Sequence, residues 1–393
     1  MIAATVGAIL LAAITLYATL GGADFGGGLW DLLAGGDRRG LAPRALIDES
    51  ITPVWEANHV WLIFALVIFW TAFPDAFAAV MTAVALPIWL AVLGIVLRGA
   101  GFAFRKEVHR LSLQRVLGAT FAVSSLLTPF FMGTVIGAIA AGKIPGHASH
   151  ATVSAWTGAT SLLIGFLFTG ACGYLAAVYL IGEAARRDDH RLQAYFTRRA
   201  QAAGIVTGAL SLATLLELHN SDPALFSRLA GRALPLVIVA AVSGLAVLGL
   251  LAAGRLRGIR VIAALGVAAV IWGWGVAQYP ALLPGTPVTL SNAGAPHATQ
   301  TALVVLFAAL VLLVGPAFAL LFFLQSRRVL SAGDAALGLA ASLAGATQPP
   351  AAPPGRPAGS AGRPGPGSRA AVLGLVAVAA LGRALARHRR DRR

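Results

Sequence analysis

The sequence predicts an all-α integral membrane protein of about nine transmembrane helices, with its N-terminus outside the cell and its C-terminus in the cytoplasm. The first observation behind this prediction is composition. Of the 393 residues, 58% are hydrophobic and only 11% are charged, whereas about 25% of the residues in a soluble domain are charged. The second is that apolar runs of about 20 residues, long enough to cross a bilayer core, recur along the chain. The third is that the segments between these runs alternate between basic and nearly uncharged.

The apolar runs set the expected spans, in order along the chain, at 3–22 (running on towards 34), 52–73, 76–98, 116–140, 158–181, 200–217, 234–253, 259–278 and 301–324. Four segments between spans are rich in arginine or lysine, namely 35–51, 99–115, 182–199 and 254–260. The segment after the last span is also basic. The other segments, 141–157, 218–233 and 279–300, carry only Lys143, Arg228 and Arg232. Basic loops are retained on the cytoplasmic side, and this alternation gives the predicted orientation. It also accounts for the net charge of +15 without a nucleic-acid partner.

The two ends of the chain differ in character. The N-terminus begins apolar without a basic region or a small-residue cleavage site, so we expect a retained first helix rather than a signal peptide. Residues 1–330 form the predicted transmembrane domain. Residues 331–393 are rich in proline, glycine, alanine and arginine, and we expect a disordered cytoplasmic tail. An apolar stretch near its end is too short to span, and either lies along the inner membrane surface or is unstructured.

Ionisable residues inside spans are the candidates for function, because a charge at bilayer depth is costly and must face protein, water or a partner charge. Asp24 is the first, in the stretch GGADFGGGLWDLL. Its glycines allow another helix, a lipid headgroup or a cofactor to approach the backbone closely. Asp24 is therefore either a functional acid or a polar residue capped by a neighbouring helix in a small-residue packing face. Asp31, nearer the end of the span, is expected at the membrane interface.

The stretch SITPVWEANHVWLIF places Glu56, Asn58 and His59 within one turn of the second span. Glu56 and His59 are three residues apart and share a helix face, while Asn58 points elsewhere. Glu56 suits the first turn of a helix capped by Thr52, where the helix dipole favours a carboxylate. It is also placed to collect protons from the cytoplasm, and the two interpretations are compatible. His59 is a candidate proton relay, haem ligand or packed polar residue.

Three further residues in or beside the spans have ordinary structural explanations. Arg98 ends the third span and either reaches the inner headgroups or pairs with an intramembrane carboxylate. Asp75 follows Pro74 and is predicted to cap a helix, and Trp61 is predicted to pack between helices. Cys172 stands alone, and the chain has no CxxCH motif, phosphate-binding loop or metal-ligand spacing. We therefore predict no metal site and no directly catalytic residue in this chain.

Several of these motifs resemble subunit II of the cytochrome bd-type quinol oxidases over roughly residues 1–330. The resemblance rests on GGADFGGGLWDLL, on SITPVWEANHVWLIFALVIFWTAFPDAF, on LPIWLAVLGIVLRGAGFAFR, and on YPALLPGTPVTLSNAGAP with LLVGPAF. It implies a multi-pass subunit of the bacterial cytoplasmic (inner) membrane, paired with a larger subunit I. Subunit I would carry haem b and haem d, oxidise quinol at the outer face and reduce dioxygen to water with protons from the cytoplasm.

The resemblance also implies roles for particular residues. Asp24 matches the acid of the family's glycine-rich segment, and Glu56 matches an acidic position after a tryptophan. His59 stands where other members carry glutamine, which argues against a haem ligand. Subunit II is thus expected to support subunit I and to contribute a proton pathway through Asp24, Glu56 and His59. Asn58, Trp61 and Arg98 would be polar or packing contacts between helices. A bound quinone or lipid and a small accessory subunit are further expectations.

Two alternatives of other classes remain open at this stage. An ion-coupled secondary transporter would use Asp24 and Glu56 to bind its coupling ion, and would have discontinuous helices and two related halves. A structural scaffold would need the acids for assembly only. Solute uptake by the chain alone would favour the transporter, whereas co-purification with a haem-bearing subunit would favour the oxidase.

Overall fold

The computed structural model describes residues 2–51, 55–105 and 111–326. For a minority of these it describes the backbone alone: 37, 38, 51, 55–57, 102, 105, 111–115, 314, 317–319 and 321–326. The chain divides into two units, Met1–Pro316 and Ala317–Arg393. The predicted tail lies outside the described residues, and the predicted domain boundary stays a prediction.

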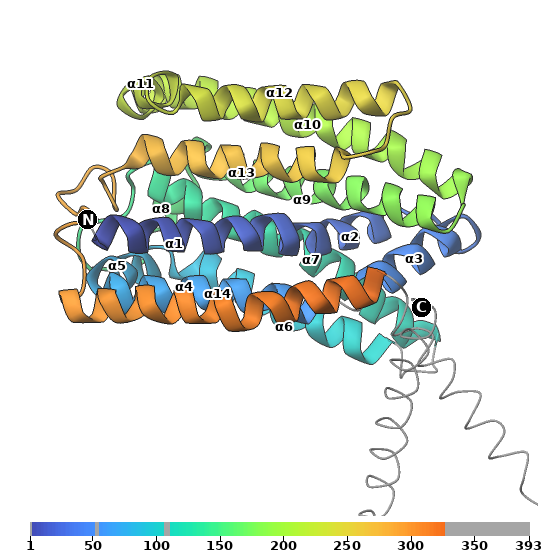
Figure 1. The fold of residues 1–393 in the computed structure, drawn as a ribbon, viewed down its shortest axis with the longest axis horizontal. Coiled ribbons are helices and arrows are strands. Elements are labelled where there is room, and N and C mark those ends of the chain that lie inside the picture. The colour runs from blue at the N-terminus through green and yellow to red at the C-terminus, as the bar shows by residue number, and fades with distance from the viewer. Residues whose placement is uncertain (1, 52–54, 106–110, 327–393) are drawn as a thin grey trace, which may run out of the picture. The chain divides into compact units, whose positions relative to one another are not determined.

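The described residues are helical apart from connecting turns and one isolated antiparallel bridge between Ala281 and Thr289, in agreement with the predicted all-α class. The elements are α1 (Ile2–Leu16), η1 (Tyr17–Gly21), α2 (Gly22–Leu32), α3 (Asp37–Ile51), α4 (Trp55–Ala72), α5 (Pro74–Ala83), α6 (Ala85–Arg105), α7 (Leu111–Ala140), α8 (Val153–Trp156), α9 (Ala159–Arg186), α10 (His190–Ser221), α11 (Pro223–Ala230), α12 (Leu234–Ala252), α13 (Ile259–Gln278) and α14 (His297–Ser326). Within the first unit the long helices lie side by side (Figure 1).

Six of the described helices are long and apolar enough to cross a membrane: Ile2–Leu32, Val116–Ala140, Ala159–Arg186, His190–Ser221, Leu234–Ala252 and Ile259–Gln278. The bent pair α4–α5 makes a seventh if it is counted as one span. Shorter apolar stretches of α6 and α14, Ala85–Gly101 and His297–Leu313, fall below the length of a full span. The structure therefore supports a multi-pass membrane protein, while the number nine and the orientation stay predictions.

The predicted span at 76–98 is interrupted in the structure, because the chain breaks at Val84 between α5 and α6. Pro87 has no N–H, so it cannot donate to the carbonyl oxygen of Ala83 four residues earlier. The backbone N–H of Thr152 donates to that oxygen instead, at 3.1 Å. On the other side of α5, the described part of α4 and α5 meet at 118°. The predicted cap at Asp75 is also wrong, since Phe73 caps α5 and Asp75 is exposed in its first turn.

Two segments predicted as basic loops are largely helical. Most of 35–51 forms α3, whose Leu46 and Ile47 are buried. Segment 182–199 divides between α9 and α10, which starts early because the Asp189 carboxylate accepts a hydrogen bond from the Leu192 N–H at 2.9 Å. Hydropathy did not predict these helices because both segments are rich in charged residues. Tertiary contacts stabilise their helical turns instead.

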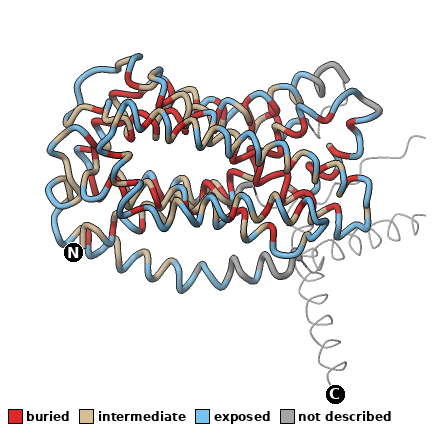
Figure 2. The backbone as a smooth tube through the Cα atoms, turned by 90° about the horizontal axis from the view of Figure 1, so that it is seen from above, coloured by how far each residue is buried: buried red, intermediate tan, exposed pale blue. Residues whose placement is uncertain are grey.

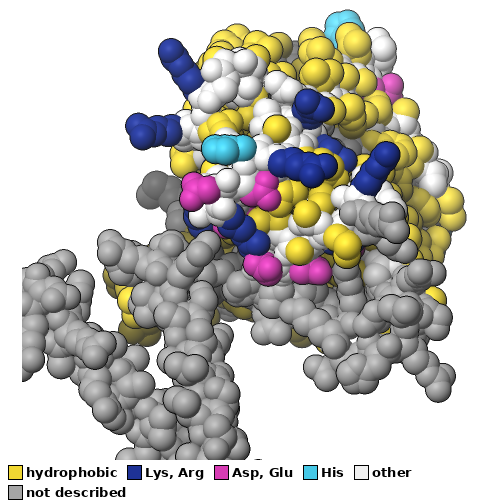
Figure 3. Space-filling model, turned by 90° about the vertical axis from the view of Figure 1, so that its right-hand side faces the viewer, with side chains coloured by type: hydrophobic (Ala, Val, Ile, Leu, Met, Phe, Trp, Pro, Cys, Tyr) yellow, Lys and Arg dark blue, Asp and Glu magenta, His cyan; other side chains and the backbone are white. Residues whose placement is uncertain are grey.

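The arginine-rich turns nevertheless share one end of the helical bundle. The α2–α3, α9–α10 and α12–α13 connections lie together at the end opposite the N-terminus (Figure 1). Viewed from that side, Lys and Arg side chains stand out beside several acidic ones (Figure 3). We refer to this as the basic end. Such clustering is the arrangement that the positive-inside rule requires of cytoplasmic loops.

Buried residues lie mainly where helices face one another, and the outward faces of the outer helices are exposed (Figure 2). The pairs α9–α10, α6–α7, α7–α9 and α2–α9 pack closely. Toward the basic end, one apolar cluster joins α2, α3, α9, α10, α12 and α13. A second cluster, which includes Phe73 and Leu283, lies around α1, α4, α5 and α7. Between them, Tyr17, Phe25 and Cys172 form a small cluster beside the polar site described next.

Candidate functional site

Four buried polar residues from four helices meet near the middle of the bundle, and we call them the Asp24 site. Asp24 comes from α2, Asn58 from α4, Arg98 from α6 and Ser125 from α7. Their exposed fractions are 3%, 4%, 2% and 1%, respectively. The structure thus brings together three residues singled out from the sequence, and adds a serine that was not.

Asn58 connects α4 to α2 through its side-chain amide. Its Nδ2 donates to Oδ2 of Asp24 at 2.6 Å and also lies 3.3 Å from the carbonyl oxygen of Leu20. Leu20 belongs to η1, a π-helical turn that interrupts the first span immediately before α2. Such turns are uncommon and are often found at functional sites. The turn and the amide together fix where the Asp24 carboxylate stands.

Arg98 lies inside the bundle, where its side chain is buried. Its Nη2 donates to the backbone carbonyl oxygen of Asp24 at 2.7 Å, and its Nε donates to Oγ of Ser125 at 2.9 Å. The guanidinium carbon stands 4.8 Å from the ring centre of Phe25 and 5.2 Å from that of Phe121. Two aromatic faces and two hydrogen bonds stabilise the buried cation. The guanidinium in turn compensates the charge of the neighbouring carboxylate.

The glycines around Asp24 serve helix packing. A Cβ on Gly26 would collide with the carbonyl of Cys172 on α9, and a Cβ on Gly28 would collide with the Ser125 side chain on α7. Close approach of α2 to both helices therefore requires glycine at these positions. Of the possibilities drawn from the sequence, the structure places neighbouring helices, not a ligand, against the described glycine face.

The remaining predicted residues of the second span divide into two groups. His59 is partly buried, and its ring stands 6.0 Å from that of Tyr17 and 6.1 Å from that of Phe25, edge to face in both cases. Trp61 packs against the same small cluster and makes an edge contact with Phe64 at 6.4 Å. The backbone of Glu56 lies in the first turn of α4. Its side chain, like Thr52 and Pro53, lies outside the described residues.

The described surroundings of His59 are largely aromatic. Aromatic rings occupy the space beside the imidazole, and no group of three His, Cys, Asp or Glu side chains that could hold a metal ion occurs among the described residues. The expectation that the haems lie in the partner subunit stays a prediction.

Asp31 is 5% exposed, and its expected place at the membrane interface stays a prediction. Its Oδ1 lies 3.0 Å from Nε of Arg44, which reaches over from α3. Neither Arg44 nor Ser125 was singled out from the sequence. The hydroxyl residues Ser124, Ser125 and Thr128, all buried in an apolar span, were the available signal for α7, whereas the Arg44 contact depends on how α3 folds back.

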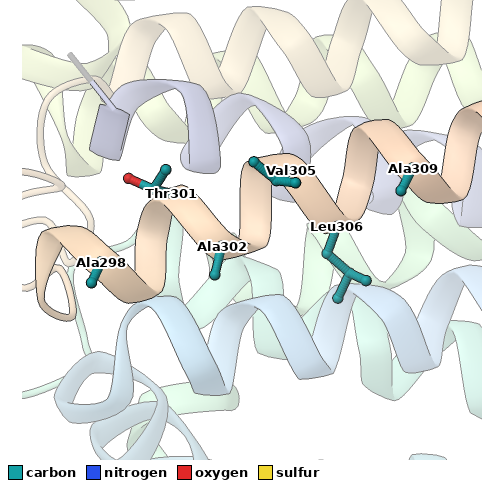
Figure 4. A pocket seen from close by; sticks show the side chains of 6 residues that line it. All are labelled: Ala298, Thr301, Ala302, Val305, Leu306 and Ala309. Atoms are coloured by element: carbon teal, nitrogen blue, oxygen red, sulfur yellow. The ribbon is translucent and has the colours of Figure 1, made fainter.

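An open groove of about 770 Å³ runs along the outer face of α14, far from the buried acids in sequence. It is lined by one face of that helix, namely Ala298, Thr301, Ala302, Val305, Leu306 and Ala309 (Figure 4). Apart from the Thr301 hydroxyl the lining side chains are apolar, and Val305 and Leu306 are 62% and 60% exposed. The groove is thus a largely apolar surface.

Comparison with known proteins gives one consistent family. Residues 2–325 match the family described as cytochrome bd terminal oxidase subunit II. The chain is 28% identical over 227 residues to cytochrome bd ubiquinol oxidase subunit 2 of Bacillus subtilis, covering 56% of this chain and 63% of that relative. It is 26% identical over 121 residues to cytochrome bd-I ubiquinol oxidase subunit 2 of Escherichia coli K12, covering 31% of each chain.

The fold has a counterpart among solved structures. A chain of the bd oxidase from Geobacillus thermodenitrificans superposes with a TM-score of 0.66, covering 82% of this chain and 98% of that one. The sequence identity over this alignment is 19%. The likeness therefore establishes a shared helical architecture and, at this identity, nothing about individual side chains.

Proposed function

Since the chain belongs to the cytochrome bd terminal oxidase subunit II family, we propose that it is subunit II of a quinol oxidase in the bacterial inner membrane. A larger subunit I is its partner and carries haem b and haem d. There, quinol is oxidised and dioxygen is reduced to water. Subunit II supports this partner, and its outer surface contacts membrane lipids, a bound lipid or quinone, and a small accessory subunit where one is present.

The second part of the proposal is that this chain carries protons from the cytoplasm toward the haem subunit, through Asp24, Glu56 and His59. The Asp24 site is the observation that carries it. Asp24 is 3% exposed, yet one of its carboxylate oxygens accepts from Asn58 and its backbone accepts from a buried arginine. A carboxylate held this way can exist with or without its proton inside the bundle, because its partners stabilise the charged form and burial favours the neutral one.

The arrangement of α2 and α4 supports the direction of transport. Glu56 belongs to the first turn of α4, the turn that also carries Asn58 beside Asp24. His59 follows one turn later and contacts the two rings that flank the Asp24 site. If the basic end faces the cytoplasm, as the positive-inside rule requires, these residues lie in the order in which a proton from the cytoplasm would meet them.

The two other functions considered from the sequence receive less support. The π-helical turn beside Asp24 interrupts a span, and interrupted helices are expected in a transporter. The family match over residues 2–325 nevertheless favours the oxidase. A scaffold role would explain Asn58 and Arg98 as helix-to-helix contacts. It would not require a carboxylate among them.

The test begins with the complex purified through this subunit. An absorption spectrum should show haem, and the haem should be absent when this chain is expressed without its partner. Asp24→Asn and Glu56→Gln should then slow quinol-dependent oxygen consumption and charge separation in proteoliposomes while haem content per complex stays normal. Haem content that falls in step with activity would support the scaffold instead. Unchanged turnover and charge separation in both variants would refute the proton pathway.

A further inference from the structure

A second buried acid on α2 has no role in the function proposed above. Asp31 stands in the last turn of that helix, where the negative end of the helix dipole makes a carboxylate unfavourable. It is nevertheless only 5% exposed, and its Oδ1 lies 3.0 Å from Nε of Arg44. The Arg44 side chain is 26% exposed, so the pair joins the protein interior to the solvent at the basic end.

Asp31 and Asp24 lie along the same side of α2. They are seven residues apart, which in an α-helix corresponds to a rise of about 10.5 Å and a rotation of only about 20°. Between them on that side stand Gly27 and Gly28, which have no side chain to fill the space. The position that a Cβ of Gly28 would take is already occupied by the Ser125 side chain, including its hydroxyl oxygen.

Ser125 therefore places a hydroxyl group between the two acids. Its Oγ accepts from Nε of Arg98 at 2.9 Å, and Nη2 of the same arginine donates to the backbone oxygen of Asp24. The same hydroxyl donates to the carbonyl oxygen of Phe121 at 2.6 Å. Polar groups are thus spaced along this side of α2, from Arg44 at the surface and Asp31 to Ser125 and the Asp24 site.

From this row we propose that Asp31, in addition to Glu56, takes up protons at the basic end and passes them to Asp24, with Arg44 as its exchangeable partner. The inference rests on the proton role proposed for this chain. A proton from cytoplasmic water binds the Asp31 carboxylate, and the neutral acid loses its ion pair with Arg44. The guanidinium remains held by the carbonyl oxygen of Gly35 at 2.7 Å. The proton then moves by way of water and the Ser125 hydroxyl to the Asp24 carboxylate, which restores the Asp31–Arg44 pair.

A simple clamp is the competing explanation. Arg44 donates to Gly35 and lies near the carbonyl oxygen of Asp31, and such bonds close the C-terminal end of a helix. A clamp explains the arginine, but carbonyl oxygens alone would suffice for it. It does not explain why the carboxylate is buried on the side of α2 that leads to Asp24.

The experiment compares Asp31→Asn, Asp31→Glu and Asp75→Asn in the whole oxidase complex, reconstituted in proteoliposomes with a quinol substrate. Asp31→Asn preserves the size of the side chain and an oxygen for Arg44 to contact. Asp75 is an exposed acid in the first turn of α5 and serves as the matched control. The readouts are oxygen consumption, the ratio of its rates in H₂O and D₂O, and haem content per complex.

We expect Asp31→Asn to lower turnover about tenfold or more, to raise the H₂O/D₂O rate ratio and to keep normal haem content. Asp31→Glu should recover most of the rate, and Asp75→Asn should match the wild type. Loss of haem in proportion to activity would mean that Asp31 is only a clamp. Asp24→Asn in parallel separates the two proposals: if it slows turnover and Asp31→Asn does not, the uptake role of Asp31 is refuted alone. If neither does, the proton pathway fails as a whole.

Discussion

Replacing Gly26 by alanine tests how the fold holds the Asp24 site in place. The added Cβ would fall far inside the 3.0 Å limit that real Cβ contacts respect, against the backbone carbonyl of Cys172. Because that carbonyl belongs to the interior of α9, it cannot rotate away as a side chain would. The two helices must therefore separate by about 1 Å, and close-packed interiors tolerate such a shift poorly.

The magnitude follows from a matched pair of variants. Gly244 lies within α12, and a Cβ there would meet no atom within 4 Å. Alanine gains about 0.5–1 kcal/mol of helix stability over glycine at either position, so this gain cancels between the two variants. The difference between them is the overpacking cost alone, about 1–3 kcal/mol against Gly26→Ala.

The assay is the temperature at which half of the haem absorbance of the purified complex is lost after a fixed heating time. Unfolding of such a complex is irreversible, so the order of the variants is the testable quantity. We expect Gly244→Ala to equal or exceed the wild type and Gly26→Ala to fall clearly below both. A Gly26→Ala complex as heat-resistant as the wild type would refute the close α2–α9 contact.

Three further changes probe the charges. Asn58→Ala removes the 2.6 Å donor of the Asp24 carboxylate, and a buried acceptor left without this partner should cost about 1–3 kcal/mol, seen as earlier haem loss on heating. Arg98→Gln alone should lower heat resistance more than Arg98→Gln combined with Asp24→Asn, since an uncompensated buried charge costs about 3–5 kcal/mol. A double variant whose loss equals the sum of the two single losses would mean that the two charges are uncoupled. Glu49→Gln breaks an ion pair with Arg187 whose side chains are 65% and 30% exposed. It should change stability by no more than about 0.5 kcal/mol, and a large drop in heat resistance would contradict that.

The helical class was predictable from the sequence because hydropathy reports which segments avoid water, whatever their neighbours. The break at residue 84 was not, although Pro87 was visible. A proline in the first turn of a helix is as ordinary as one that ends a span. What decides between them is the backbone N–H of Thr152, which donates to the carbonyl oxygen of Ala83. Thr152 is far away in sequence.

The site was predictable in part for a similar reason. Asp24 and Asn58 could be selected because polar groups in apolar helices need partners. Which partners they have depends on how the helices are arranged, and Arg98 could equally have pointed to solvent. Ser125 and Arg44 carry no sequence signal of comparable strength, because serine is common in spans and arginine is common in basic loops. Only the folded chain places them on the same side of α2.

The energetics of the Asp24 site bear on the choice between a scaffold and a proton route. A buried ion pair is rarely the most stable solution, and well-packed apolar residues of similar volume are often as stable or more so. Here α2, α4, α6 and α7 each contribute a polar group to the site. Glycine at positions 26 and 28 already lets α2 pack closely on its neighbours. Cohesion of the bundle therefore does not require the carboxylate. A proton route, in contrast, requires a group that can gain and lose a proton.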